Sequence, residues 1–290
     1  MVIIDAERCT ACGTCVKVCH EHCMTLVDGR LVIDYGSCST CTQCIAICPR
    51  KALSWDGILP EDFDPASMPS ARQVDELLQE RRTIRQFAEA PLARETLEEI
   101  VSRGIYAPTH NFDLRCILID DPELIRAFDR AAFQFSSRIL KFLFRPWPVR
   151  ALLAVAPRSL RDEYAKALPK LELAVKRGRG YDCAPPALVC VVADGRVPLS
   201  LESAQYALYA MTLSAQVRGV ACRNLVGNQM IFNRNREIRR GLGLKRHERI
   251  VAVAGFGWPA VHFKGKVLGK RMQLQWNGAG PAASASPGAS

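Results

Sequence analysis

Several features that would narrow the function are missing from this sequence. It has no P-loop and no G-x-G-x-x-G motif, so it does not indicate a nucleotide cradled by a glycine-rich turn. No stretch approaches the roughly 18 uninterrupted apolar residues of a membrane span, so we expect no integral membrane segment. The first residues, "MVIIDAERC", lack a basic region followed by a long apolar one, so we expect a cytoplasmic protein.

Cysteine, in contrast, is abundant and unevenly placed. The chain has 13 cysteines, an odd number, and two matching sets lie near its start. The segments "IIDAERCTACGTCVKVC" and "VIDYGSCSTCTQCIAIC" repeat one another with an offset of 29 residues, from Cys9 to Cys38. The pattern C-x2-C-x2-C-x3-C occurs in both and comprises Cys9, Cys12, Cys15, Cys19, Cys38, Cys41, Cys44 and Cys48. This spacing is typical of metal ligands in a reducing compartment rather than of disulfides.

Residues 1–56 resemble the bacterial two-[4Fe–4S] ferredoxin module. The resemblance implies that one cluster is held by Cys9, Cys12, Cys15 and Cys48, and the other by Cys38, Cys41, Cys44 and Cys19. A structural zinc site is the alternative, although zinc sites usually use paired C-x2-4-C knuckles. Cys23 falls opposite Ala52 in the repeat, so we interpret it as a spare thiol rather than an alternative ligand.

The rest of the chain alternates between predicted helices and strands. Asp28-Gly29 between two apolar runs predicts a hairpin, so residues 1–56 should form a pseudo-twofold β-α-β pair. Residues 57–70 are rich in proline and acids, which predicts a linker, and Ser70 or Asp75 should cap the next helix. Helices are predicted over 74–82, 95–104 and 203–219, and strands over 114–121, 187–194 and 249–259. The large domain, 71–278, is therefore α+β or α/β, and the tail, 279–290, should be disordered.

The large domain carries a series of motifs, beginning with "RRTIRQF" at 81–87. Its guanidinium groups and its threonine hydroxyl suit a phosphate and a polar ring edge, although the motif taken alone is better explained by a solvated basic helix end. The motifs that follow are "APTHN", "APPALVCVVAD", "AMTLSAQVRGVAC" and "LGLKRHERIVAVAGFGWP". Together they resemble the FMN-dependent nitroreductase family over about residues 71–276. The segment "HFKGKVLGKRMQLQW" resembles the C-terminal basic segment of its ferredoxin-fused members.

The resemblance implies an α+β sandwich, homodimers with FMN at the subunit interface, and a set of FMN-binding residues. In this sequence those residues are Arg81, Arg82, Thr83, Arg85, Asn111, Val226, Gly227, Lys270 and Arg271. Asn111 would reach the flavin ring, and the backbone of Val226 and Gly227 would approach its N5 atom. No catalytic acid is assigned, because His110 is more simply a bystander on a loop. Residues 158–180 are interpreted as a helical lid over the flavin.

We therefore expect an iron–sulfur flavoprotein that passes electrons through two [4Fe–4S] clusters to FMN for reduction of a small organic acceptor. The resemblance implies nitro compounds, quinones or activated double bonds as acceptors, and a low-potential protein as the electron donor. One alternative has FMN oxidising a substrate while the clusters export electrons, and another is a flavin-free electron-transfer protein. The formal charge of +10 would fall by about four with two clusters bound, so we expect no nucleic acid partner.

Overall fold

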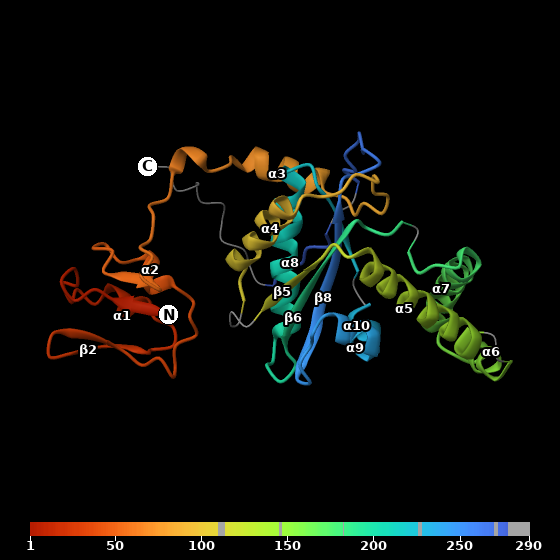
Figure 1. Ribbon diagram of the computed structural model, residues 1–290, viewed down its shortest axis with the longest axis horizontal. Coiled ribbons are helices and arrows are strands. Elements are labelled where there is room, and N and C mark those ends of the chain that lie inside the picture. Colours follow the sequence, from red (N-terminus) through yellow and green to blue (C-terminus); the bar gives the residue numbers. More distant parts are fainter. Residues whose placement is uncertain (110–113, 145–146, 182, 226–227, 270–271, 278–290) are drawn as a thin grey trace.

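The N-terminal repeat is visible in the computed structural model, which describes residues 1–109, 114–144, 147–181, 183–225, 228–269 and 272–277 (Figure 1). Its elements are β1 (Val2–Ile4), α1 (Thr14–Val18), β2 (Met24–Val27), β3 (Arg30–Ile33), α2 (Gln43–Ala46) and β4 (Leu53–Trp55). Strand β1 pairs with β4 and β2 with β3, both antiparallel. The hairpin between β2 and β3 turns at Asp28 and Gly29, whose φ angles of 48° and 74° suit a type I′ turn. The expected hairpin and β-α-β pair are confirmed.

This module has a hydrophobic core of its own. Val2, Met24 and Leu53 are almost inaccessible to solvent and pack with cysteines from both sets. The two buried apolar clusters of the large domain consist of later residues, beginning at Leu97. Because burial of apolar surface is the main stabilising contribution to folding, each part has the means to fold around its own core.

The segment after the module leads into a capped helix. Within 57–70 the structure has a 3-10 turn at Pro65–Ser67, and helix α3 then covers Ala71–Glu80. The Ser70 hydroxyl accepts a hydrogen bond from the backbone N–H of Gln73, and the Gln73 side chain accepts one from the backbone N–H of Ser70. This capping box fixes the start of α3 and shows that Ser70, not Asp75, is the cap.

The large domain is built on an antiparallel sheet with the strand order β5-β6-β8-β7. Its strands are β5 (Arg115–Ile119), β6 (Ala187–Asp194), β7 (Ala221–Asn224) and β8 (Glu248–Gly257). Strands β6 and β8 occupy the centre. From Ala187 to Ala193 strand β6 is buried at every position, as expected for a strand covered on both faces.

Helices cover both faces of this sheet. On one face, α4 (Arg94–Ser102), η2 (Arg103–Tyr106) and α8 (Ser200–Val217) pack around Val189 and Val191. On the other face, α5 (Pro122–Ile139), α9 (Gln229–Arg234) and α10 (Arg236–Gly241) pack around Leu188 and Cys190. Helix α8 ends where Gly219 adopts a φ of 71°, a conformation that costs glycine little. The predicted α+β sandwich is confirmed.

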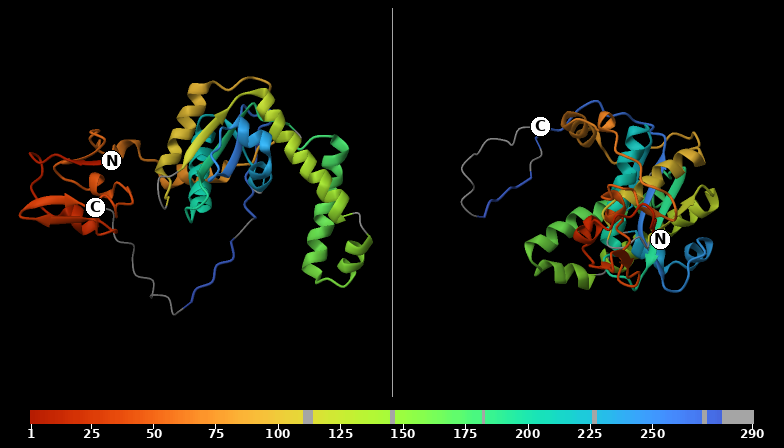
Figure 2. Two further views of the ribbon diagram at one scale, coloured as in Figure 1. Left: turned by 60° about the horizontal axis from the view of Figure 1, so that its bottom comes forward. Right: turned by 90° about the vertical axis from the view of Figure 1, so that its left-hand side faces the viewer.

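Helix α5 continues beyond the sheet into a helical arm (Figure 2). The chain passes through a π-helical turn at Leu140–Phe144 and helix α6 (Trp147–Ala154) into α7 (Arg158–Arg177), which packs against α5. The predicted helix in 158–180 is therefore confirmed. Among the described residues, none from α7 lines the pocket that contains Arg81 and Arg82, and the interpretation of 158–180 as a lid stays a prediction.

No helix in the described part of the chain combines the length and the apolar character that a membrane crossing requires. The predicted disordered tail, 279–290, lies outside the described residues.

Candidate iron–sulfur and flavin sites

The two cysteine loops share an unusual backbone. In the first loop Ala11 and Gly13 have φ angles of 52° and 75°, and in the second loop Thr40 and Thr42 have φ angles of 57° and 61°. The positions match at the offset of the repeat, although three of these residues are not glycine. Left-handed conformations cost an L-residue roughly 1–2 kcal/mol, and such turns direct successive backbone N–H groups into an anion-binding concavity. Both loops therefore have the backbone that a negatively charged cluster with its thiolates requires.

The first loop encloses a cavity lined by cysteines from both halves of the repeat. Cys9, Cys12 and Cys15 come from the first set, and Cys48 comes from the second. The cavity is completed by the apolar side chains of Leu26 and Leu31, and of further residues on β4 and the preceding turn. Four thiols around one cavity are the donor set of a [4Fe–4S] cluster, and their grouping is the one that the ferredoxin resemblance implies.

The extra thiol lies beside the second proposed cluster site, which comprises Cys19 and three cysteines of the second set. Cys44 is buried, and this burial raises its pKa to about 11. The Sγ atom of Cys23 lies 3.4 Å from the Sγ atom of Cys19, and burial together with the hydrogen bond to Cys19 raises the pKa of Cys23 to about 12. Cys23 therefore lies directly beside a proposed ligand, a proximity that the sequence repeat did not show.

A zinc site would need three or more ligands that converge on one ion. Among the residues that the structure describes, no three histidine, cysteine or carboxylate side chains are grouped in this way. In a [4Fe–4S] cluster each cysteine thiolate binds a different iron atom. The four cysteine sulfur atoms therefore lie farther apart than the ligands of a single metal ion.

The basic motif of the large domain runs alongside the sheet after α3. The backbone N–H of Ile84 donates to the carbonyl of Cys222 on β7 at 3.4 Å, and Phe87 forms a β-bridge with Pro259 after β8. Gly257 is required here, because a Cβ at this position would lie 2.4 Å from Pro186 Cγ and 3.0 Å from Phe87 Cδ1. Three segments are therefore packed together: the proline pair at 185–186, the end of β8 at 255–257 and the basic motif at 81–87.

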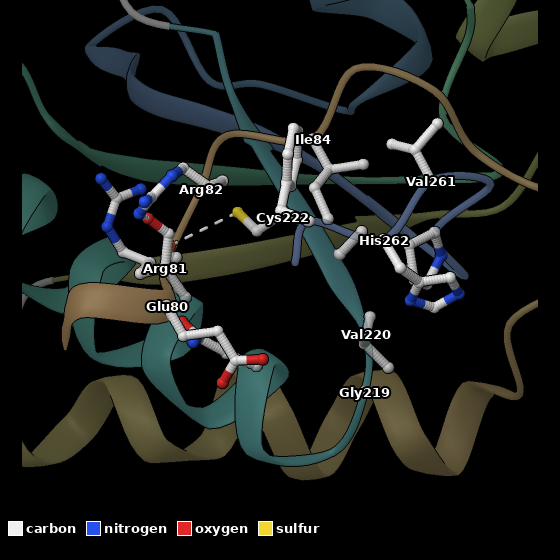
Figure 3. Close-up of a pocket in the computed structure, with 14 residues that line it drawn as sticks. Glu80, Arg81, Arg82, Ile84, Gly219, Val220, Cys222, Val261 and His262 are labelled. Carbon is white, nitrogen blue, oxygen red and sulfur yellow. Dashed lines mark hydrogen bonds between the residues drawn. The ribbon is translucent and has the colours of Figure 1, made fainter. Parts of the chain in front are cut away.

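A pocket lies where this motif meets the end of α8, strand β7 and residues 259–263 (Figure 3). Arg81 and Arg82 line it together with Ile84, Val220 and Val261. Its polar lining includes Glu80, Thr212, Gln216 and His262. The pocket thus combines guanidinium groups at one end with aliphatic side chains around it.

Comparison with known proteins decides the family. The model of the nitroreductase family matches residues 78–258, and that of a 4Fe-4S dicluster domain matches residues 1–49. The chain belongs to the nitroreductase family. It is an oxidoreductase of that family with an N-terminal dicluster domain, and the dicluster domain implies two [4Fe–4S] clusters. A search of curated proteins gave no match.

Solved structures with this fold include an iodotyrosine deiodinase bound to FMN and 3-iodo-L-tyrosine. It is 18% identical, covers 70% of this chain and 98% of its own, and has a TM-score of 0.51. A nitroreductase with bound FMN from Desulfitobacterium hafniense DCB-2 is 16% identical, covers 66% of this chain and 92% of its own, and has a TM-score of 0.49. An FMN-dependent nitroreductase from Clostridium difficile R20291 is 16% identical, covers 66% and 91%, and has a TM-score of 0.45. At these identities the likeness concerns the fold alone.

In this nitroreductase-family domain, the Figure 3 pocket offers groups that fit a flavin. The Gln216 Nε2 atom donates to the carbonyl of Leu77 at 3.0 Å, whereas Gln216 Oε1 is buried without a partner among the described residues. A buried acceptor of this kind is costly unless a donor reaches it, and a flavin ring or its ribityl chain carries such donors. Arg81 supplies a cation, and burial raises the pKa of the neighbouring Cys222 to about 11, so this thiol stays neutral.

The four described residues of the nitroreductase motif have different surroundings. Arg82 Nη1 donates to the carbonyls of Gln79 at 2.6 Å and Arg81 at 2.8 Å, so it caps the C-terminus of α3. Arg85 does not line the pocket and lies near Arg223, whose guanidinium is 5.0 Å from the ring centroid of Tyr181. Burial lowers the pKa of Arg223, and the charge of Arg85 adds to this decrease. Thr83 is half-buried on the same segment.

The remaining predicted FMN residues lie outside the described part of the chain; they are Asn111, Val226, Gly227, Lys270 and Arg271. His110 lies outside it as well. Sequence reasoning missed Gln216, Cys222 and His262 as pocket residues. Gln216 and Cys222 belong to the motif "AMTLSAQVRGVAC", and His262 opens the segment "HFKGKVLGKRMQLQW". These patterns indicate a buried helix with a strand and a basic segment, and neither pattern singles out a pocket residue.

Proposed function

We propose that this protein is an iron–sulfur flavoprotein in which two [4Fe–4S] clusters deliver electrons to FMN for reduction of a small organic acceptor. The observation that carries this proposal is the presence, in one chain, of two matching cysteine loops and a nitroreductase-family domain with a cationic pocket. When bound, FMN would accept electrons one at a time from the clusters and would pass two electrons to a substrate. The substrate class is that of the resemblance: nitro compounds, quinones or activated double bonds.

In this proposal the chain's own residues bind and position the cofactors. The two cysteine sets hold the clusters, with Cys48 and Cys19 exchanged between the halves of the repeat. Arg81 and Arg82, which line the pocket, would hold FMN together with the predicted residues outside the described part of the chain. Thr83 and Arg85 would complete this set from the same segment, although they do not line the pocket, and Arg82 also orders the end of α3. The Gln216 acceptor would orient a polar edge of the bound group, and Ile84, Val220 and Val261 would shield it from water.

We also propose a homodimer, in agreement with the family resemblance. Helix α8 and η2 leave large apolar side chains at the surface, including Ile105, Tyr106 and Tyr206, each more than half exposed. An adjoining copy of the chain would bury such a surface, since exposed apolar patches of this kind are typical of protein interfaces. Light scattering coupled to size-exclusion chromatography tests this, and a monomer at micromolar concentration would contradict it.

The experiment that tests the function measures cofactors first. Anaerobically purified protein should contain about eight irons per chain and extractable FMN. An absence of flavin, even after incubation with FMN, would favour the electron-transfer protein without flavin.

The second measurement is stopped-flow reduction of the flavin by a low-potential protein donor. Full-length protein should be reduced much faster than a chain lacking residues 1–56, because a tethered donor has an effective concentration on the order of millimolar. A small chemical reductant serves as the control and should reduce both proteins. Equal rates with the protein donor would show that electrons enter the flavin without the clusters.

A further inference from the structure

The structure holds a second cationic pocket, far from the proposed flavin site. Its lining comes from α9, α10, the segment after α10 and the start of β8, and consists of Met230, Asn233, Arg234, Arg239, Arg246 and Arg249. Helices α9 and α10 lie beside β8 in Figure 1. The proposed flavin site adjoins the other end of the strand, near Gly257. Eight residues of strand separate Arg249 from Gly257, which corresponds to roughly 25 Å. The arginine pocket is thus a separate feature of the molecule.

Hydrogen bonds to the backbone hold the frame of this pocket in place. The Asn233 side chain donates to the carbonyl of Ile250 at 2.8 Å and accepts from its N–H at 2.8 Å, which ties α9 to β8. Arg239 donates to the carbonyls of Lys245 at 2.8 Å and Glu248 at 3.1 Å. Two pocket residues therefore connect three segments, and the guanidinium of Arg239 is already oriented before any ligand binds.

Arg249 is held in a similar way from the strand itself. Its Nη1 atom donates to the carbonyls of Arg246 at 2.8 Å and Glu248 at 3.0 Å. The other nitrogen atoms of this guanidinium have no hydrogen-bond partner within the described part of the chain, so they are available to a ligand. A planar group that is fixed by the backbone loses little freedom when it binds an anion.

Among the described residues that line the pocket, none has a carboxylate to balance its charge. Glu248, which precedes Arg249 on β8, accepts hydrogen bonds from Arg115 at 2.9 Å and from the backbone N–H of Lys245 at 2.8 Å. Glu237 of α10 is paired with Arg130 at 2.7 Å. Within the described residues, Arg234 and Arg246 have neither an ion pair nor a side-chain hydrogen bond. Four arginines thus line one concavity whose described lining includes no carboxylate, an arrangement that an anion stabilises.

We propose that this pocket binds a multivalent phosphate anion of the pyrophosphate type. Guanidinium groups form paired hydrogen bonds with phosphate oxygens, and four of them match a diphosphate better than a single carboxylate. The pocket is concave and includes Met230 and Asn233 at its wall, which fits a small ligand. The source is either free inorganic pyrophosphate or the diphosphate of a nucleotide. This inference does not depend on the proposed electron transfer.

Isothermal titration of the full-length holoprotein with inorganic pyrophosphate, at fixed ionic strength, tests the proposal. The variant Arg234→Gln with Arg246→Gln should weaken binding at least tenfold, because it removes the two guanidiniums that hold no part of the frame. The variant Arg158→Gln with Arg161→Gln makes the same change in net charge on the exposed start of α7 and should bind as the wild type does. Iron and flavin contents should be the same in all three proteins.

Parallel titrations with ADP and adenosine distinguish the sources. Equal affinity for ADP and pyrophosphate would assign the site to the phosphate groups alone, whereas tighter ADP binding would assign it to a nucleoside diphosphate. The proposal is overturned if the wild type binds neither anion at millimolar concentration, or if both paired variants weaken binding equally. Loss of flavin from the Arg234 and Arg246 variant would also overturn it, because these arginines would then serve the flavin site.

Discussion

Replacing Gly257 with alanine is a direct test of how the proposed flavin site is held together. The added Cβ would lie 2.4 Å from Cγ and 2.5 Å from Cδ of Pro186, and 3.0 Å from Cδ1 of Phe87. A proline ring cannot rotate out of the way, and Phe87 is only 6% exposed and bridged to Pro259. Relief of the overlap therefore requires a backbone shift, for which we expect a loss of about 1–3 kcal/mol in the free energy of unfolding of the large domain.

The effect should be confined to one part of the chain. The N-terminal module has a separate core, so thermal unfolding should show two transitions that different probes resolve. Visible absorption follows the clusters, and flavin fluorescence follows the large domain. The flavin-domain midpoint should fall by about 2–4 °C for each kcal/mol lost, while the cluster transition and the iron content stay unchanged. Because Phe87 ends the basic motif, FMN retention should decrease as well.

The matched control is Gly265→Ala. Apart from the two chain neighbours, no described residue has an atom within 4 Å of a Cβ built at Gly265, so this exchange should change the free energy of unfolding by less than about 0.5 kcal/mol. If the Gly257 variant melted like the control and kept its flavin, the contact between the proline pair and the basic motif would not hold the site. A fall in both transitions would instead contradict the independence of the two cores.

Three further predictions concern single sites. Replacing Arg81 and Thr83 together with alanine should give folded protein without FMN. Two contacts to the cofactor would be lost, and a charge-assisted hydrogen bond is worth about 1.5–3 kcal/mol. Full retention of FMN in a flavin extraction would mean that the site is misplaced. Cys23→Ala should keep about eight irons in a colorimetric iron assay, and loss of four would make this thiol a ligand despite its place in the repeat. The hydrogen bond from the Lys245 backbone N–H is the main cause that lowers the pKa of Glu248, and Arg115 lowers it further. The stabilising contribution of the Glu248 carboxylate is therefore present above the ordinary pKa of 4.5 and is lost as the pH falls through the lowered pKa. Urea unfolding between pH 3 and 7 should therefore show that Glu248→Gln loses less free energy of unfolding in acid than the wild type does. The same dependence of the free energy of unfolding on pH in both proteins would refute this.

The elements of the fold were largely predictable, because each leaves a local signature in the sequence. Continuous apolar residues identified β6, and alanine-rich spacing with a terminal glycine identified α8. The Asp28-Gly29 pair identified the hairpin. These signatures depend on the chain's own geometry over a few residues, so neighbouring elements are not needed to interpret them. The course of the helical arm was not predictable in this way, because the position of α7 depends on its packing against α5.

For the cofactor sites, the sequence by itself determined the eight repeat cysteines and the basic motif, because cluster and phosphate chemistry demand particular residue types at short spacing. The ferredoxin resemblance also implied that Cys48 joins Cys9, Cys12 and Cys15, and these four line one cavity in the structure. Only the tertiary structure placed Cys23 beside Cys19. It likewise turned Arg82 back onto α3 and gathered the arginine pocket at the start of β8. These contacts join residues that are brought together only when the chain folds. The spacing of residues in a short stretch of sequence does not predict which side chains a turn or a sheet edge will bring into contact.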